Sequence, residues 1–134
     1  MENCVFCKII SGEFSSRKIY EDENTLAFLD ISKDVDGHIL VAPKKHCKNI
    51  LDCDEKTLSK VMDTVKKVSN HLVENCGYDG VNLINSSGEA AEQKMLHLHI
   101  HIIPRKHDDG LEVCPKLSGA TDDLDEVLSR LKMN

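Results

Sequence analysis

The sequence lacks a long apolar run and a positive net charge, and each absence excludes a class of function. No stretch approaches the ~20 consecutive apolar residues that a transmembrane helix needs, so we expect no membrane-spanning segment. The net charge is −6 at pH 7, whereas nonspecific nucleic-acid binding depends on Lys and Arg neutralising phosphates. We therefore expect no membrane and no nucleic acid among the partners, while a small phosphorylated ligand needs only a few local donors.

The sequence also lacks internal repeats, low-complexity segments and the features of a secretory signal. Glu2 stands where a signal peptide would be basic, and no long apolar region follows it. We expect a single domain over residues 1–134 and a cytoplasmic location. In a reducing compartment the six cysteines are expected as metal ligands or free thiols, and only Cys4 and Cys7 have ligand-like spacing.

Hydrophobic periodicity predicts an α+β domain with a largely antiparallel sheet. The strands are expected at 17–21, 25–31, 38–42, 80–85 and 96–105, with 22–24 as a hairpin turn, and a short helix at 4–10. The apolar residues expected on the first strands are Leu26, Phe28 and Ile31.

Two further helices are expected from apolar residues repeating at three- and four-residue spacing. The longer runs from about Glu55 to Cys76, with Asp52 or Asp54 as its cap, and its core-facing stripe is Leu58, Val61, Met62, Val65, Val68, Leu72 and Val73. A last helix is expected to have Thr121 as its cap and Leu124, Val127, Leu128 and Leu131 on one face.

The stretch from Leu96 to Arg105 alternates polar and apolar residues, which is typical of a β-strand with two different faces. It places His97, His99 and His101 on one face, and the other face, expected in the core, carries Leu96, Leu98, Ile100 and Ile102. A strand rises about 3.3 Å per residue, so the outer two imidazoles would stand roughly 13 Å apart. One metal ion cannot easily hold all three, which indicates that the histidines divide structural and chemical roles.

Cys4 and Cys7 form a second pattern, in which two thiolates can share one Zn²⁺ if two more ligands complete a tetrahedron. The competing interpretation is a redox pair, which normally follows a strand and opens a helix at its first cysteine. Spacing alone leaves the other two metal ligands undetermined.

The histidine stretch resembles the His-x-His-x-His signature of the histidine-triad (HIT) nucleotide-binding family. Further blocks agree in family order over roughly residues 4–105, while the segment 106–134 does not match distinctively; these blocks are 26–31, 37–41, 43–46 and 99–105. The resemblance implies a five-stranded antiparallel sheet with a long helix and shorter terminal helices, usually in a homodimer. It points to the zinc-containing bacterial-type branch that resembles nucleoside phosphoramidases.

The activity implied by this resemblance is hydrolysis at the α-phosphate of a nucleotide. His99 would attack phosphorus and form a nucleotidyl-histidine intermediate, and His101 would hold the phosphate or pass protons. A neutral attacking nitrogen, oriented by a hydrogen bond at the other ring nitrogen, suits this chemistry. The phosphate donors would be the side chains of Asn85 and Gln93 and the backbone N–H of Lys94.

The same resemblance assigns the nucleoside and the metal. Asp30 would bind the ribose hydroxyls, and the purine base pocket would be lined by Ile9, Phe28, Leu29 and Ile31. A structural zinc would be held by Cys4, Cys7, His46 and His97, with Cys47 as a substitute for His46. Four protein ligands leave no open position for a metal-bound water.

Three departures from the family pattern affect the details. Many relatives have Gly-Gln before the triad, whereas this chain has Glu92 before Gln93. Asp36 stands where Pro is common, and the loop 85–93 is slightly long relative to some branches. Ser86 is therefore an alternative to Asn85 at the phosphate.

The resemblance favours a purine nucleoside phosphoramidase that cleaves the P–N bond of a nucleoside 5′-phosphoramidate. The alternatives are a dinucleoside polyphosphate hydrolase, a nucleotide-binding interaction module with incidental catalysis, and a hydrolase that uses zinc-bound water. Nucleotidyl transfer is less favoured, because transferase relatives often have Gln at the position of His101 or Pro at the position of Leu98.

Overall fold

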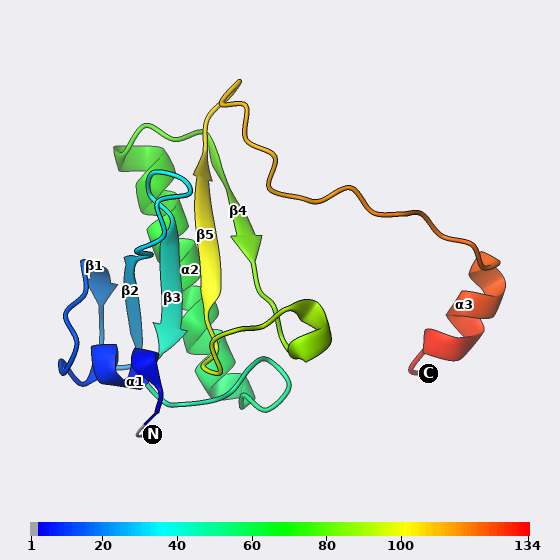
Figure 1. The fold of residues 1–134 in the computed structure, drawn as a ribbon, viewed down its shortest axis with the longest axis horizontal. Helices are drawn as coiled ribbons and strands as arrows, with labels where there is room; N and C mark the ends of the chain where they lie inside the picture. The colour runs from blue at the N-terminus through cyan, green and yellow to red at the C-terminus, as the bar shows by residue number, and fades with distance from the viewer. Residues whose placement is uncertain (1–2) are drawn as a thin grey trace.

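Five short strands form one antiparallel sheet in the computed structural model, which describes residues 3–134 and leaves Glu2 outside the described residues. Their bounds are β1 Lys18–Glu21, β2 Thr25–Leu29, β3 Ile39–Pro43, β4 Gly80–Ile84 and β5 Ile100–Arg105. The order across the sheet is β1-β2-β3-β5-β4, and all neighbouring pairs are antiparallel (Figure 1). The predicted α+β class with a five-stranded antiparallel sheet is confirmed.

The β1–β2 hairpin is closed by the turn predicted at residues 22–24. The Asp22 carboxylate accepts hydrogen bonds from the backbone N–H groups of Asn24 and Thr25, both at 2.8 Å. An aspartate that binds the backbone two or three residues ahead stabilises a tight turn without help from the rest of the fold. Ile31 was predicted to belong to the apolar face of these strands. That prediction is wrong, because β2 ends at Leu29 and Ile31 is 87% exposed.

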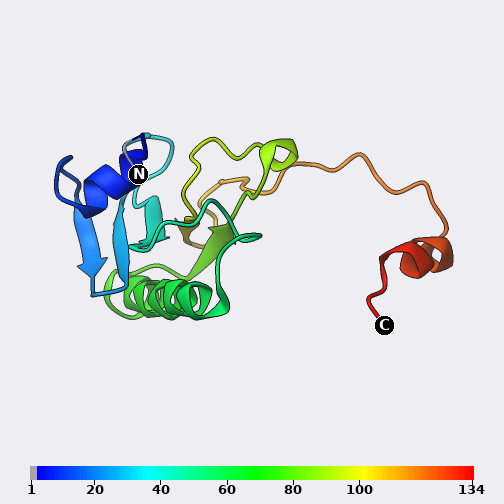
Figure 2. The ribbon, with the colours of Figure 1, turned by 90° about the horizontal axis from the view of Figure 1, so that it is seen from below.

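Helix α2, Glu55–Asn75, packs on one face of the sheet (Figure 2). Asp54, one of the two predicted caps, accepts a hydrogen bond from the Thr57 N–H at 3.0 Å. The core-facing side of α2 is buried at Val61, Val65, Val68 and Leu72, whereas Met62 and Val73 are each 42% exposed. The predicted stripe was therefore too wide at its two edges.

Helix α1, Val5–Ile10, covers the opposite face of the sheet, so the sheet lies between two helices (Figure 2). The alternation of strand side chains divides the core accordingly. On β2, Leu26 and Phe28 pack with Phe6 of α1, whereas Ala27 belongs to the cluster that contains the α2 residues. The cavity described below lies on the α1 side.

The histidine stretch is only partly a strand, so the predicted strand 96–105 was wrong over its first four residues. β5 begins at Ile100, and Leu96, expected in the core, is 57% exposed. Continuing the β3–β5 register would place Pro43 opposite Leu98, and proline has no N–H for the ladder. The Leu98 N–H instead donates to the Cys47 carbonyl at 2.9 Å, which turns this segment away from β3.

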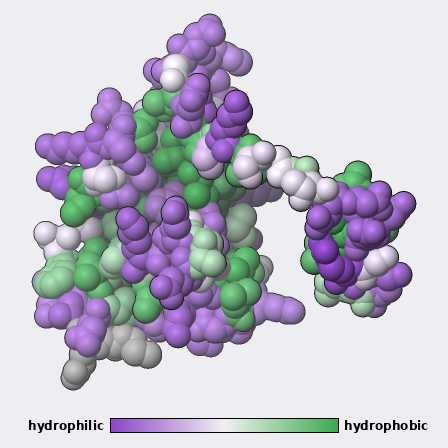
Figure 3. All heavy atoms as spheres, turned by 45° about the vertical axis from the view of Figure 1, so that its right-hand side comes forward, coloured by the Kyte–Doolittle hydropathy of each residue, from purple (hydrophilic) through white to green (hydrophobic). Residues whose placement is uncertain are grey.

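The segment after β5 leaves the sheet and ends in α3, Leu124–Leu131, which stands apart from the rest of the protein (Figure 1). The cap of α3 is Asp123 rather than the predicted Thr121, because the Asp123 carboxylate accepts from two N–H groups of the first turn. Apolar residues on α3 remain exposed, as Figure 3 shows, and include Leu124, Leu128 and Leu131. Over residues 3–134, no helix combines the length and apolar character needed to cross a membrane.

Candidate functional site

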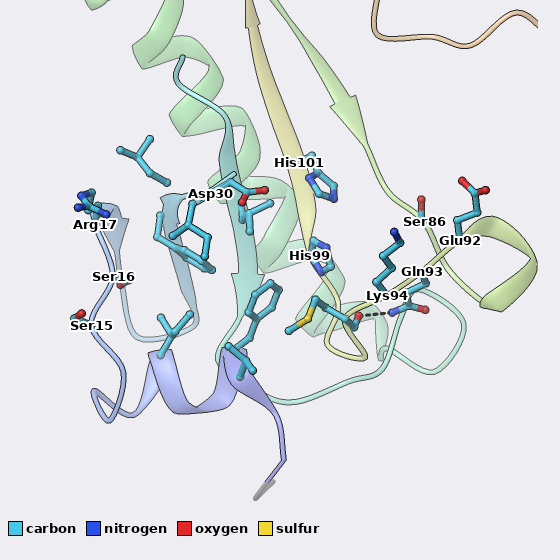
Figure 4. Close-up of a pocket in the computed structure, with 18 residues that line it drawn as sticks. Ser15, Ser16, Arg17, Asp30, Ser86, Glu92, Gln93, Lys94, His99 and His101 are labelled. Carbon is cyan, nitrogen blue, oxygen red and sulfur yellow. Dashed lines mark hydrogen bonds between the residues drawn. The ribbon is translucent and has the colours of Figure 1, made fainter. Parts of the chain in front are cut away.

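A cavity of about 730 Å³ opens beside β3 and β5 on the α1 face of the sheet (Figure 4). Ser15, Ser16 and Arg17 lie at one side, Ser86, Glu92 and Lys94 lie at the other, and His99 and His101 lie between them (Figure 4). The two imidazoles therefore lie in the middle of the cavity, between two groups of polar side chains.

His99 is held in a single tautomer by the backbone carbonyl of His97, two residues earlier in the chain. Its Nδ1–H donates to the His97 carbonyl at 2.7 Å, which leaves Nε2 as the nitrogen with the free electron pair. Burial lowers the pKa of His99 below its ordinary value. His99 also lines the cavity, so the neutral imidazole can act there as a nucleophile.

His101 belongs to a chain of polar groups that sequence reasoning did not find. Its Nδ1 lies 2.8 Å from Nε2 of His38, and Nδ1 of His38 lies 3.0 Å from the Asp34 carboxylate. Burial, followed by the neighbouring His99 and His38, lowers the pKa of His101 to about 4. The chain Asp34–His38–His101 is therefore built to hold or move a proton at the edge of the cavity.

The sequence contained a signal for His38. Alternation along β3 puts His38 on the same face as Leu40, and Leu40 pairs opposite His101. A histidine beside a buried strand, four residues after an aspartate, was the pattern that sequence reasoning passed over.

Asp30 lies just after β2 and lines the cavity. One carboxylate oxygen accepts the Ser32 N–H at 2.9 Å, and the other lies 3.6 Å from Nε2 of His38. An oriented carboxylate at the cavity wall can accept hydrogen bonds from a sugar hydroxyl pair.

The part of the cavity next to α1 is apolar. Ile9, Phe28, Leu29 and Ile31 line it, together with residues that sequence reasoning missed, among them Val5, Phe6 and Leu40. The Phe6 ring stands edge-on to both His99 and Phe28, with centroid distances of 5.0 and 5.5 Å. Such a surface suits a flat aromatic base.

The loop 85–95 does not present all of its predicted side chains to the cavity. The Asn85 amide donates to the His99 carbonyl at 3.0 Å, and Ser86, the predicted alternative, lines the cavity. Gln93 and Lys94 line it as well (Figure 4), but the Gln93 side-chain amide donates to the backbone carbonyls of Lys48 and Met95. Glu92 lines the cavity in the left-handed conformation, with φ 65°.

A second constellation brings together the four predicted metal ligands, Cys4, Cys7, His46 and His97. Nδ1 of His97 lies 3.3 Å from the Cys4 sulfur and 3.1 Å from Nδ1 of His46, and the Cys7 sulfur lies 3.4 Å from the latter. Ligands of a tetrahedral Zn²⁺ stand roughly 3.3 to 3.8 Å apart when Zn–N is about 2.0 Å and Zn–S about 2.3 Å. The spacing of these atoms therefore fits a single ion.

The chemistry of the donor set also fits a cation. The Nε2–H of His97 donates to the Pro43 carbonyl at 2.8 Å, which directs the electron pair of Nδ1 toward the two sulfurs. Burial and the neighbouring Cys4 raise the pKa of the Cys7 thiol to about 11, so the thiolate pair needs a positive charge. Cys47, the predicted substitute for His46, instead packs in the core cluster with α2 residues.

A model of the HIT domain matches residues 11–108. The chain belongs to the HIT family. A relative from Schizosaccharomyces pombe named adenosine 5′-monophosphoramidase is 34% identical over 107 residues, 80% of this chain and 77% of the relative. Adenylylsulfatase HINT3 from Arabidopsis thaliana is 39% identical over 129 residues, 96% of this chain and 66% of the relative.

Solved structures agree with this assignment. The crystal structure of a Zn-bound histidine triad family protein from Mycobacterium smegmatis is 36% identical and has a TM-score of 0.79. The superposition covers 84% of this chain and 81% of the other. The sheet and helices of this HIT protein are therefore those of its family.

The burial of the imidazoles predicts how they titrate. We expect His101 to stay neutral until the pH falls to about 4 and His99 to protonate below its ordinary range. The unfolded chain binds these protons near pH 6.5, so stability should fall as the pH drops from 6.5 toward 4. NMR titration of the ring nitrogens, with unfolding measured at pH 7.5 and 5, checks both points; a His101 pKa at or above 6.5 would contradict the expectation.

Proposed function

We propose that this HIT protein is a purine nucleoside phosphoramidase, which hydrolyses the P–N bond of a nucleoside 5′-phosphoramidate. The observation that carries the proposal is the single tautomer of His99, whose unprotonated Nε2 belongs to an imidazole lining the cavity. Asp30 and the apolar end next to α1 supply complementary surfaces for a ribose and a purine base. The phosphoramidase relative supports P–N cleavage, since its name states this activity.

The proposed reaction has two steps at the α-phosphorus. Nε2 of His99 attacks phosphorus, the P–N bond breaks, and His101 delivers a proton to the departing amine. His38 replaces that proton across its 2.8 Å contact with His101, backed by Asp34. Water then attacks phosphorus, the bond to His99 breaks, the relay accepts the proton from water, and the nucleoside monophosphate leaves.

Donors for the phosphate oxygens are proposed on the loop 85–95, chiefly the backbone N–H of Lys94 and the side chain of Ser86, both of whose residues line the cavity. The leaving group is less constrained, because the adenylylsulfatase relative is named for a substrate with a sulfate leaving group. An acid-anhydride hydrolase, including one acting on dinucleoside polyphosphates, is therefore the second candidate.

The nucleophile is tested by His99→Ala. We expect release of the monophosphate from adenosine 5′-phosphoramidate to fall by at least about a thousandfold, because no other group attacks phosphorus. Binding of AMP should persist. His71→Ala is the matched control, since His71 is exposed and, within residues 3–134, its side chain hydrogen-bonds only to Asn75.

The same assay separates the alternatives. Guanosine 5′-phosphoramidate, adenosine 5′-phosphosulfate and diadenosine tetraphosphate serve as parallel substrates. Cleavage of the anhydrides without P–N cleavage would support the second candidate, and AMP binding without any turnover would support an interaction module. Most of the wild-type rate in His99→Ala would refute the nucleophile.

We further propose that the four-residue constellation holds a structural zinc. Cys4, Cys7, His46 and His97 supply four ligands, which leave no position for a reactive water. The ion would tie α1 to the segment that carries His99. The zinc-bound relative supports the identity of the metal.

Cys7→Ser tests the role of the metal. We expect loss of bound zinc and a cost of ~3 kcal/mol, which lowers Tm by roughly 10 °C. Cys114→Ser, at an exposed cysteine, is the control and should change neither value. A chelated protein that stays fully folded but inactive would instead favour hydrolysis by metal-bound water.

A homodimer is proposed from exposed apolar side chains near the open edge of the sheet. β4 is an edge strand, and the residues concerned are Ile50, Leu51, Leu83 and Leu96. Sedimentation equilibrium should give twice the chain mass of 15.0 kDa, and a monomer at high concentration would contradict the proposal.

The six cysteines, all without disulfide partners, support a cytoplasmic location, which cell fractionation tests.

A further inference from the structure

The loop between β3 and α2 contains a buried asparagine to which the proposed reaction gives no role. Asn49 is 7% exposed, and its side-chain amide donates to the Gln93 side-chain carbonyl at 3.1 Å. The other side-chain atom, Oδ1, accepts the Leu51 N–H, and the Asn49 backbone N–H donates to the Asp52 carboxylate, both at 2.9 Å. Asn49 is therefore fixed within its own loop and reaches from there to the loop beside the cavity.

The Gln93 side chain, which accepts this hydrogen bond from Asn49, has no hydrogen of its own left to donate. Its amide nitrogen carries two hydrogens, and they go to the carbonyls of Lys48 at 2.7 Å and Met95 at 2.9 Å. Its oxygen accepts from Asn49 and from the Gly88 N–H at 2.9 Å. A side chain committed in this way acts on a phosphate through the backbone it holds, because a direct contact would require breaking one of these bonds.

A second bridge joins the same two loops. The Ile50 N–H donates to the Ser87 hydroxyl at 3.2 Å, and that hydroxyl donates to the Asn85 side chain at 2.8 Å. The Asn85 amide in turn donates to the His99 carbonyl at 3.0 Å. The loop 47–52 is thus bonded to both ends of the segment that carries the proposed phosphate donors.

We propose that Asn49 is a positioning residue for phosphate recognition and that Gln93 shares this role in place of a direct phosphate contact. The proposal rests on the function proposed above. Together the two amides set where the backbone N–H of Lys94, one residue after Gln93, points in the cavity. A donor displaced by even 1 Å loses much of its effect on a transferring phosphoryl group.

A positioning role predicts that only ligands and substrates with a phosphate group are affected by the substitution. In Asn49→Ala and in Gln93→Ala, we expect the affinity for AMP and the kcat for adenosine 5′-phosphoramidate to fall about tenfold. The affinity for adenosine, which has no phosphate, should stay within twofold, because the apolar end and Asp30 are untouched. Asn75→Ala, the same truncation at an exposed residue of α2, is the control and should change none of these values.

The double variant Asn49→Ala/Gln93→Ala distinguishes positioning from independent contacts. If Asn49 acts through Gln93, the double variant should bind AMP about as weakly as Gln93→Ala alone. If the losses of AMP affinity in the two single variants multiply in the double variant, the proposal is overturned. It is also overturned if Asn49→Ala binds AMP with wild-type affinity. An equal loss of adenosine affinity would also overturn it, because that result indicates general damage to the fold.

If Asn49→Ala does not fold, Ser87→Ala removes the second bridge at a less buried site. This variant should bind AMP about threefold more weakly and bind adenosine with unchanged affinity. Unchanged AMP affinity would refute the coupling of the two loops.

None of the binding measurements involves turnover of a substrate. A wild-type protein that binds AMP but cleaves no phosphoramidate would refute the proposed function while leaving this inference testable.

Discussion

The buried imidazole of His97 is the constraint on which both sites depend. Its Nδ1 faces two thiols and a second imidazole, and its Nε2–H is bonded to the Pro43 carbonyl. Its own carbonyl accepts the Nδ1–H of His99. One residue with no exposed surface therefore joins the proposed metal centre, β3 and the proposed nucleophile, so a displacement at any of the three would be transmitted to the others.

Neutral imidazoles dominate the middle of the cavity. Burial lowers the pKa values of His99 and His101, which keeps both rings uncharged in neutral solution. An uncharged row supplies a nucleophile and a proton carrier, but it offers little positive charge to a phosphate. Phosphate recognition then depends more on backbone donors with fixed positions, which is the role proposed for the amides of Asn49 and Gln93.

Much of the fold was predictable because its signals are local. The turn at Asp22, the cap at Asp54 and the buried stripe of α2 depend on residues a few positions apart. The start of β5 was not predictable in this way. It depends on Pro43 of another strand, which cannot pair, and on a carbonyl of the loop after β3 that takes the Leu98 N–H instead.

The sequence by itself determined the succession of strands and the main helix along the chain, because each element depends on local periodicity. It also determined the family, because several sequence blocks occur in a fixed order. Only the tertiary structure decided how the side chains are used. His38 reaches His101 from 63 positions away, and Asn49 reaches Gln93 from 44 positions away. The closure of the sheet creates the first contact and the packing of two loops creates the second, so neither depends on local sequence alone.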